Sequence, residues 1–241
     1  MPIIEVKNLS YAYDEGSEVL HNLNLQIARG SITAVIGLSG CGKTTFCRSL
    51  CGIIPNVLGG SLNGQILLDT EDINKYLLAK LATKIALVMQ NPDHQLVTTT
   101  VEDELAFAPE NLCLPPHEIN RRVDKALELL NLQKFRLRNP THLSGGEKQL
   151  VAIASVLTLE PQVLVLDEAM SHLDEDGKAM VKDALIALNE NGKTIIIVEH
   201  DLQTATFADS WVVMGEGKII REDSPAAILA DQSFLHEQNL Y

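Results

Sequence analysis

The stretch that decides the fold reads Gly37-Leu38-Ser39-Gly40-Cys41-Gly42-Lys43-Thr44. It fits the pattern GxxxxGK[ST] without a mismatch, follows an apolar run at 32–36 and opens a helical pattern at 42–51. Glycines in such a loop let backbone N–H groups turn inward around phosphate groups, and the helix N-terminus adds partial positive charge. A glycine-rich turn that only caps a helix is the alternative, but the flanking strand and helix patterns favour a phosphate-binding loop.

A second motif, which is acidic, completes the chemistry that the phosphate-binding loop predicts. Residues 163–168 form an apolar strand pattern that ends in two adjacent carboxylates, Asp167 and Glu168. In a phosphate-binding loop, Lys43 reaches the β- and γ-phosphates of a nucleotide, and the Thr44 hydroxyl is a ligand for Mg²⁺. Asp167 is then expected to hold the Mg²⁺ shell and Glu168 to act as the base for the attacking water. An acidic strand end is a weak signal alone, and the loop makes it a strong one.

Composition and charge exclude several classes of protein. The chain has 241 residues, of which 46% are hydrophobic and 21% charged, enough for one large α/β domain. Its formal net charge of −13 argues against binding to nucleic acid or to anionic lipid. The apolar runs are strand-sized, the N-terminus lacks signal-peptide features, and the four cysteines have no metal-type spacing. We therefore expect a reduced, cytoplasmic chain, for which any role at a membrane depends on a partner.

Strand patterns alternate with helical patterns along most of the sequence. This alternation implies parallel βαβ units with ligands at the carboxyl ends of the strands. From 100 to 142 the periodicity is helical, with a break at Pro115 and Pro116. We expect strands at 3–6, 23–27, 32–36, 65–69, 85–89, 163–166, 194–198 and 211–214, and further helices at 145–159, 174–189 and 201–208.

The run Leu143-Ser144-Gly145-Gly146-Glu147 is the most specific remaining motif. By itself it could simply cap a helix. Followed by Lys148 and Gln149 it resembles the signature motif of ABC ATPases, and the resemblance covers essentially the whole chain, with every motif in family order.

Further positions resemble family motifs. Tyr13 stands where the family stacks an aromatic ring on adenine, and Gln90 matches the Q-loop glutamine, which contacts Mg²⁺ and water. Residues 171–174, Ser-His-Leu-Asp, resemble the D-loop, and His200 stands at the place of the switch histidine. Outside this series, Tyr13 would be a strand surface residue and His200 an ordinary core residue.

The resemblance implies an α/β fold: a P-loop NTPase of ABC type with a mixed sheet core, an antiparallel β subdomain and an inserted helical subdomain. Residues 1–241 would form a single domain, with 1–94 and 143–241 in the core and β subdomain and 95–142 in the helical subdomain. The implied catalytic residues are Glu168, His200 and Gln90, and the implied Mg²⁺ ligands are Thr44, Gln90 and Asp167. The implied ATP contacts are Tyr13, Gly37, Ser39, Gly40, Cys41, Gly42, Lys43, Thr44, Thr45, Ser144, Gly145 and Gly146.

The family works as a head-to-tail dimer, which explains why the signature lies far from the phosphate loop in sequence. The helix start at 144–146 would point its amides at the γ-phosphate held by a second ATPase domain, identical or different. The chain departs from the family at Ala169 and Met170, where Pro-Thr is common, at Leu150, where Arg is usual, and at the bulky His172. None of these departures removes a catalytic group, but they leave the turnover rate and dimer geometry open.

Two segments resemble one branch of the family. Residues 90–96, QNPDHQL, and 101–107, VEDELAF, are similar to the Q-helix region of energy-coupling-factor (ECF) importers of vitamins or metal ions. That resemblance implies that 90–107 contacts a transmembrane scaffold subunit, that a separate membrane subunit captures the substrate, and that the chain is peripheral at the cytoplasmic face. The stretch 53–64 is longer than usual and is similar to ECF proteins with two ATPase halves in one polypeptide. Generic ABC variation with an acidic helix N-terminus remains the alternative.

Other classes of protein fit less well. An ATPase of another ABC importer or exporter is the first alternative, and a DNA-repair clamp or translation factor of the ABC type is the second. Proteins of the second kind usually add coiled coils, zinc inserts or a tandem domain and favour basic surfaces, whereas this chain is acidic. A metabolic kinase with the same loop would leave the 143–147 motif unexplained.

Overall fold

A six-stranded sheet forms the centre of the protein, in a computed structural model that describes residues 1–14, 16 and 18–240. The strand order is β10-β9-β3-β8-β7-β6; neighbouring strands are parallel except β9 and β10, which are antiparallel. Parallel strands bring their carboxyl ends to one edge, so the loops that follow β3, β6, β7 and β8 meet there. The strands are β3 (Ile32–Ile36), β6 (Ile85–Val88), β7 (Val163–Asp167), β8 (Thr194–Glu199), β9 (Ser210–Gly215) and β10 (Lys218–Asp223).

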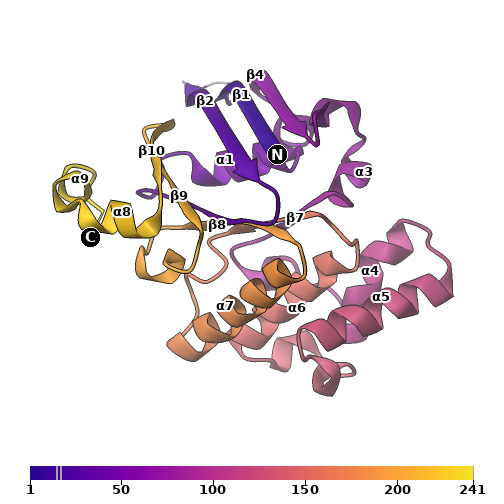
Figure 1. The fold of residues 1–241 in the computed structure, drawn as a ribbon. Helices are drawn as coiled ribbons and strands as arrows, with labels where there is room; N and C mark the ends of the chain where they lie inside the picture. Colours follow the sequence, from indigo (N-terminus) through magenta and orange to yellow (C-terminus); the bar gives the residue numbers. More distant parts are fainter. Residues whose placement is uncertain (15, 17, 241) are drawn as a thin grey trace.

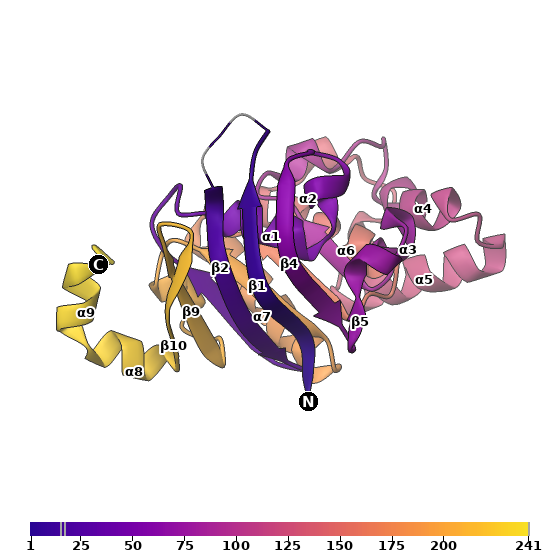
Figure 2. The same ribbon diagram turned by 90° about the horizontal axis from the view of Figure 1, so that it is seen from above.

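A second sheet is antiparallel and has the order β2-β1-β4-β5. It lies above the larger sheet in Figure 1 and in front of it in Figure 2, where α4 and α5 are to one side and the C-terminal helices to the other. Its strands are β1 (Pro2–Ala12), β2 (Glu18–Ala28), β4 (Ser61–Leu68) and β5 (Glu71–Asp72). The expected mixed core with an antiparallel β subdomain is thereby confirmed.

Helices cover both faces of the larger sheet, and the strands alternate their side chains between two cores. On β7, Val163 and Val165 face the core shared with α1 (Lys43–Leu50) and the antiparallel sheet, whereas Leu164 and Leu166 face the opposite core. That opposite core is covered by α6 (Gly145–Leu157) and α7 (Glu175–Glu190) (Figure 1). These strands are buried on both faces, which explains their continuous apolar runs.

The helical insertion contains α4 (Val101–Asn111) and α5 (Pro116–Leu129), with the expected break before Pro116. Both helices contribute buried side chains to the core beneath α6. The exact subdomain limits stay a prediction. Among the described residues, no helix is long and apolar enough to cross a membrane. The shorter helices are α2 (Ile53–Asn56), α3 (Leu78–Ala82), α8 (Pro225–Ala230) and α9 (Gln232–Glu237), and 3-10 turns lie at Ile73–Lys75, Pro92–His94, Gln133–Phe135, Pro140–His142 and Gln203–Ala205.

The helix expected at 201–208 was wrong. Only a 3-10 turn forms there, because the carboxylate of Asp201 accepts hydrogen bonds from Gln203 N (2.9 Å) and Thr204 Oγ1 (2.8 Å). Such local bonds offer the backbone an alternative to a helix. Strand β10 was not expected either, because half of its side chains are exposed and most are charged.

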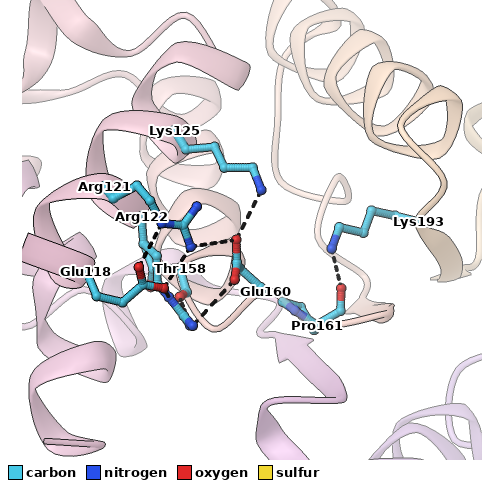
Figure 3. Close-up of polar contacts among 8 residues, drawn as sticks. All are labelled: Glu118, Arg121, Arg122, Lys125, Thr158, Glu160, Pro161 and Lys193. Carbon is cyan, nitrogen blue, oxygen red and sulfur yellow. Dashed lines mark hydrogen bonds and ion pairs between the residues drawn. The ribbon is translucent and has the colours of Figure 1, made fainter. Parts of the chain in front are cut away.

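A charged cluster ties α5 to the end of α6, and Figure 3 shows its side chains. The Arg122 guanidinium donates to the carbonyl of Thr158, which caps α6, at 2.9 Å and lies 3.4 Å from Glu160. Lys125 donates to Glu160 at 3.0 Å, and Lys193 donates to the carbonyl of the next residue, Pro161, at 2.5 Å. Because α6 leads into β7 here, the cluster lies where the helical insertion meets the sheet. We call Glu118, Arg121, Arg122, Lys125 and Glu160 the α5–α6 junction.

Candidate active site

The phosphate loop is shaped by its glycines and by Lys43. Gly37 has a φ of 156° and lies so close to β9 that a Cβ atom would approach Met214 O to 2.2 Å, so only glycine fits. Gly42, with a φ of 106°, directly precedes α1. The Lys43 ammonium is buried and donates to Gly37 O at 2.8 Å and to Leu38 O at 3.0 Å. The lysine is thus held within the loop where phosphates would lie.

The acidic pair lies directly against this loop. Thr44 Oγ1 donates to Asp167 Oδ1 at 3.0 Å, which joins the start of α1 to the end of β7. Burial raises the pKa of Asp167, and the hydrogen bond from Thr44 partly offsets that effect. Glu168 Oε1 is 3.9 Å from Lys43 Nζ. The two halves of the predicted site are therefore in contact.

The side chains of Gln90 and His200 surround Glu168. Gln90 Nε2 donates to Glu168 Oε2 at 3.1 Å, and His200 Nδ1 lies 3.9 Å from the same oxygen. Gln90 Nε2 also lies 3.3 Å from His172 Nε2 and 3.5 Å from Ser171 Oγ, which joins the Q-loop to the D-loop. A carboxylate with an amide and an imidazole beside it can accept a proton from a water molecule. The two neighbouring groups can then hold the resulting hydroxide in place.

Tyr13 lies beside α1, with its hydroxyl 3.2 Å from Thr45 Oγ1. Its ring meets the edge of the Tyr11 ring at a centroid distance of 4.9 Å and an angle of 81°. Tyr11 is fully buried and donates its hydroxyl to Gly59 O at 2.9 Å. Sequence reasoning missed this supporting role, although the long 53–64 stretch was a signal. The last residues of that stretch belong to β4, and Ser61 pairs with Ala12 at the end of β1.

The signature residues lie elsewhere. Ser144 begins α6 in a capping box: its Oγ accepts from Glu147 N at 3.3 Å, and Glu147 Oε2 accepts from Ser144 N at 2.9 Å. Gly146 packs against Gly177 of α7 so closely that a Cβ atom would come within 2.8 Å of Gly177 Cα. Among the described residues, no hydrogen bond or ion pair joins 144–146 to the phosphate loop. The structure thus brings together the other predicted site residues but not these three.

The segment after Gln90 is bound to the signature helix. Gln95 Oε1 accepts from Met89 N at 3.1 Å, while its Nε2 donates to Ala152 O at 2.9 Å in α6. Lys148, also in α6, donates to Asp93 at 2.8 Å. The side chain of Gln95 is therefore engaged in hydrogen bonds within the chain.

The donor set fits a hard divalent cation. A hydroxyl (Thr44), a carboxylate (Asp167) and an amide carbonyl (Gln90) offer oxygen ligands, which Mg²⁺ prefers, usually together with water and substrate phosphates. No group of three or more His, Cys, Asp or Glu side chains suited to a metal occurs in the described part of the chain. That is in keeping with a site in which the nucleotide itself supplies ligands.

The fold and the site define a class of protein: an ATPase of the ABC type. The family model described as "ABC transporter" matches residues 20–171, more than half of the chain. The chain belongs to this family, and it is an ATP-binding, ATP-hydrolysing transporter subunit.

Its particular relatives are the ATPases of energy-coupling-factor transporters. The energy-coupling factor transporter ATP-binding protein EcfA of Methanosarcina acetivorans is 42% identical over 231 residues, which cover 96% of this chain and 83% of the relative. EcfA1 of Leuconostoc mesenteroides is 38% identical, and the matched residues cover 98% of this chain and 86% of EcfA1. The solved structure of cbiO1 from Clostridium perfringens, described as part of the ABC transporter complex cbiONQ, has a TM-score of 0.87 at 35% identity and covers 99% of this chain and 95% of its own.

Proposed function

We propose that this chain is the motor subunit of an ECF-type importer of a vitamin or a metal ion, attached to membrane subunits at the cytoplasmic face. The observation that carries the ATPase part is the meeting of the Thr44–Asp167 pair with Lys43, Gln90 and Glu168 at one sheet edge. Similarity to EcfA proteins over nearly the whole chain supports the ECF part. The alternative is the ATPase of another ABC importer or exporter.

In the proposed site, Lys43 and the loop amides hold the β- and γ-phosphates, and Tyr13 stacks on adenine. Glu168 accepts the proton of the attacking water, while Gln90 and His200 orient that water and the γ-phosphate. Thr44, Asp167 and Gln90 would hold Mg²⁺, which supplies charge neutralisation when bound. The remaining proposed nucleotide contacts are Gly37, Ser39, Gly40, Cys41, Gly42 and Thr45.

The proposed working unit is a head-to-tail pair of ATPase domains. At the start of α6 the capping box pairs the amides of Ser144 and Glu147, and those of Gly145 and Gly146 have no partner among the described residues, so the small Ser144-Gly145-Gly146 surface suits an anion. Within one chain this surface packs beside the D-loop and makes no polar contact to the phosphate loop among the described residues. A second chain placed head to tail would supply the γ-phosphate to it, so ATP would hold the two domains together.

The proposed membrane contact lies in 90–107. Its first part is joined to α6 by the contacts Asp93–Lys148 and Gln95–Ala152. Through Gln90 it is also joined to the edge of the larger sheet where Lys43, Asp167 and Glu168 meet, which we call the ATP edge. Movement of this segment would therefore shift the signature helix and the Glu168 environment together. Coupling of ATP hydrolysis to transport needs an element of this kind, whose conformation both the ATP site and the membrane contact can shift.

The test is transport by the complex that copurifies with this chain. Asp93 is replaced by Ala, because its side chain is 59% exposed and its pairing with Lys148 adds little stability. Asp183→Ala, an exposed change on α7, is the control. We expect uptake of the copurifying small molecule to fall sharply in Asp93→Ala only, with ATP affinity unchanged. Normal uptake would return the chain to the other ABC importers and exporters.

A further inference from the structure

Glu199 is the last residue of β8, and the proposed site gives it no role. Its side chain is only 1% exposed. Ile195 and Ile197 of the same strand face the core that contains α6 and α7. Because side chains alternate along a strand, Glu199 points to that same side, toward the turn that links β7 to α7.

Among the described residues, the carboxyl group of Glu199 has one hydrogen-bond partner. Its Oε1 accepts from the backbone N–H of Met170 at 3.4 Å. Its Oε2 is enclosed and has no hydrogen-bond partner among the described residues. Buried polar atoms without a partner are costly, so a side chain of this kind is usually retained for a function.

The turn that Glu199 contacts is the one that carries Glu168. Glu168 has a φ of 49°, a left-handed conformation that is uncommon outside glycine and persists only where the surroundings hold it. The backbone N–H of Glu168 donates to Val198 O at 3.0 Å. Two adjacent residues at the end of β8 thus hold the turn at two points, Val198 at Glu168 and Glu199 at Met170.

The charges around Glu199 are mostly negative. The carboxylates of Glu168 and Asp201 and the ammonium of Lys178 act on it electrostatically, and that ammonium lies 3.0 Å from Glu175 and 4.0 Å from Asp201. Burial raises the pKa of Glu199 to about 8; the carboxylates of Glu168 and Asp201 add to this effect, and the Met170 N–H and the Lys178 ammonium oppose it. Burial of this kind favours the protonated form of the carboxyl group at neutral pH.

We propose that Glu199 is a positioning residue for ATP hydrolysis, whose buried carboxyl group holds the turn that carries Glu168 against the end of β8. The inference rests on the proposed role of Glu168 as general base. A protonated carboxyl gives Met170 N–H an acceptor without placing a negative charge behind Glu168. Loss of the proton would add a charge that opposes the anionic phosphate in the transition state.

Two substitutions separate positioning from packing. Glu199→Leu keeps the bulk but removes the acceptor, and we expect kcat to fall about tenfold while the Kd for ATP stays within about twofold. Glu199→Gln keeps an uncharged acceptor and should restore kcat at pH 7 to within about threefold of the unaltered protein. Glu222→Gln, an exposed change on β10, is the charge-matched control.

The pH profile is the readout that a purely structural role would not move. Between pH 7 and pH 9 the unaltered protein and Glu222→Gln should lose about tenfold in kcat, because the proton of Glu199 is lost. Glu199→Gln has no such proton and should keep its rate over this range. The profile remains decisive if Glu199→Leu fails to fold.

Either of two results would overturn the proposal: a Glu199→Gln profile that superimposes on that of the unaltered protein, or a folded Glu199→Leu protein with unchanged kcat. Glu168→Gln is measured in parallel. If Glu168→Gln hydrolyses ATP normally, the proposed base is wrong whatever the Glu199 variants do. Failure of the positioning role and failure of the base assignment are therefore distinguishable.

Discussion

The ATP edge and the α5–α6 junction both contain several carboxyl groups, but the two regions shift the pKa values of these groups in opposite directions. At the ATP edge, burial raises the pKa of Asp167 and of Glu199. At the junction, hydrogen bonds from Arg121 and Arg122 lower the pKa of Glu118 to about 2. For Glu160, burial would raise the pKa, but Lys125 and Arg121 together outweigh burial and lower it.

The difference lies in the partners. The junction supplies arginines and a lysine at direct hydrogen-bond distance, so its carboxylates are structural (Figure 3). At the ATP edge, the buried ammonium of Lys43 is 3.9 Å from Glu168 and donates to loop carbonyls. Carboxyl groups that lack full pairing are typical of sites where a proton or a phosphate must be handled.

The largest expected effect is that of Glu168→Gln. The amide keeps the shape but cannot accept the proton of water, so we expect ATP hydrolysis to fall by about 10²–10⁴-fold while ATP still binds. Glu190→Gln, an exposed carboxyl at the end of α7, should hydrolyse at the normal rate. Steady-state phosphate release together with ATP titration makes the measurement, and near-normal release would show that Glu168 is not the base.

Lys43→Ala should act on binding. Its ammonium is buried and held in the phosphate loop, and truncating one partner of a buried charge pair costs roughly 2–5 kcal/mol. The Kd for ATP, measured by direct titration, should rise accordingly. Lys182→Ala, an exposed change on α7, provides the comparison. An unchanged affinity in Lys43→Ala would contradict the phosphate-loop assignment.

A change at the junction should affect stability and leave nucleotide binding alone. Arg122 is mostly buried and donates to Thr158 O, and a hydrogen bond from a charged group contributes roughly 1.5–3 kcal/mol. Arg122→Ala should lower the free energy of unfolding by that amount in urea denaturation, with the Kd for ATP unchanged. Loss of ATP binding without loss of stability would mean that the junction belongs to the nucleotide site.

The smallest effects, those of pH on stability, should have opposite signs in the two regions. The pKa of Glu199 is raised, so its contribution to stability is full below about pH 4.5 and is lost as pH rises through about 8. The pKa of Glu118 is lowered, so its contribution is present above about pH 4.5 and is lost as pH falls toward 2.

Thermal unfolding of Glu199→Gln and Glu118→Gln against the unaltered protein measures this contrast. The Tm of Glu199→Gln should gain on the unaltered protein as pH rises from 5 to 8. The Tm of Glu118→Gln should lie below it at neutral pH and converge with it in acid. Parallel curves for the two variants would remove the distinction between the regions.

The sheet core could be predicted from the sequence because its signals are local, and the residues that meet around Glu168 stand in equally local motifs. A motif such as 37–44 carries its own strand and helix context, and the buried strands have unmistakable apolar runs. The helix expected at 201–208 failed because the side chain of Asp201 competes for the backbone. Strand β10 lacked the apolar pattern that a buried strand would show.

The supporting residues could not be found in this way, since they depend on contacts between distant segments. Tyr11 reaches Gly59 across a strand pairing, and Gln95 reaches Ala152 in α6. Glu199 stands next to His200 in sequence, but only the fold shows that its carboxyl lies beneath the Glu168 turn. The signature residues are the reverse case: their motif was clear, yet among the described residues they make no hydrogen bond to the phosphate loop of the same chain.

The ATPase rate of Ser144→Arg tests most directly whether a second domain completes each ATP site. At saturating ATP, in the complex that copurifies with this chain, Ser144→Arg should hydrolyse at least about 10²-fold more slowly while the isolated chain binds ATP normally. Mixing Ser144→Arg with Lys43→Ala should then raise activity above either alone if one intact site suffices. Full activity of Ser144→Arg by itself would contradict the head-to-tail site.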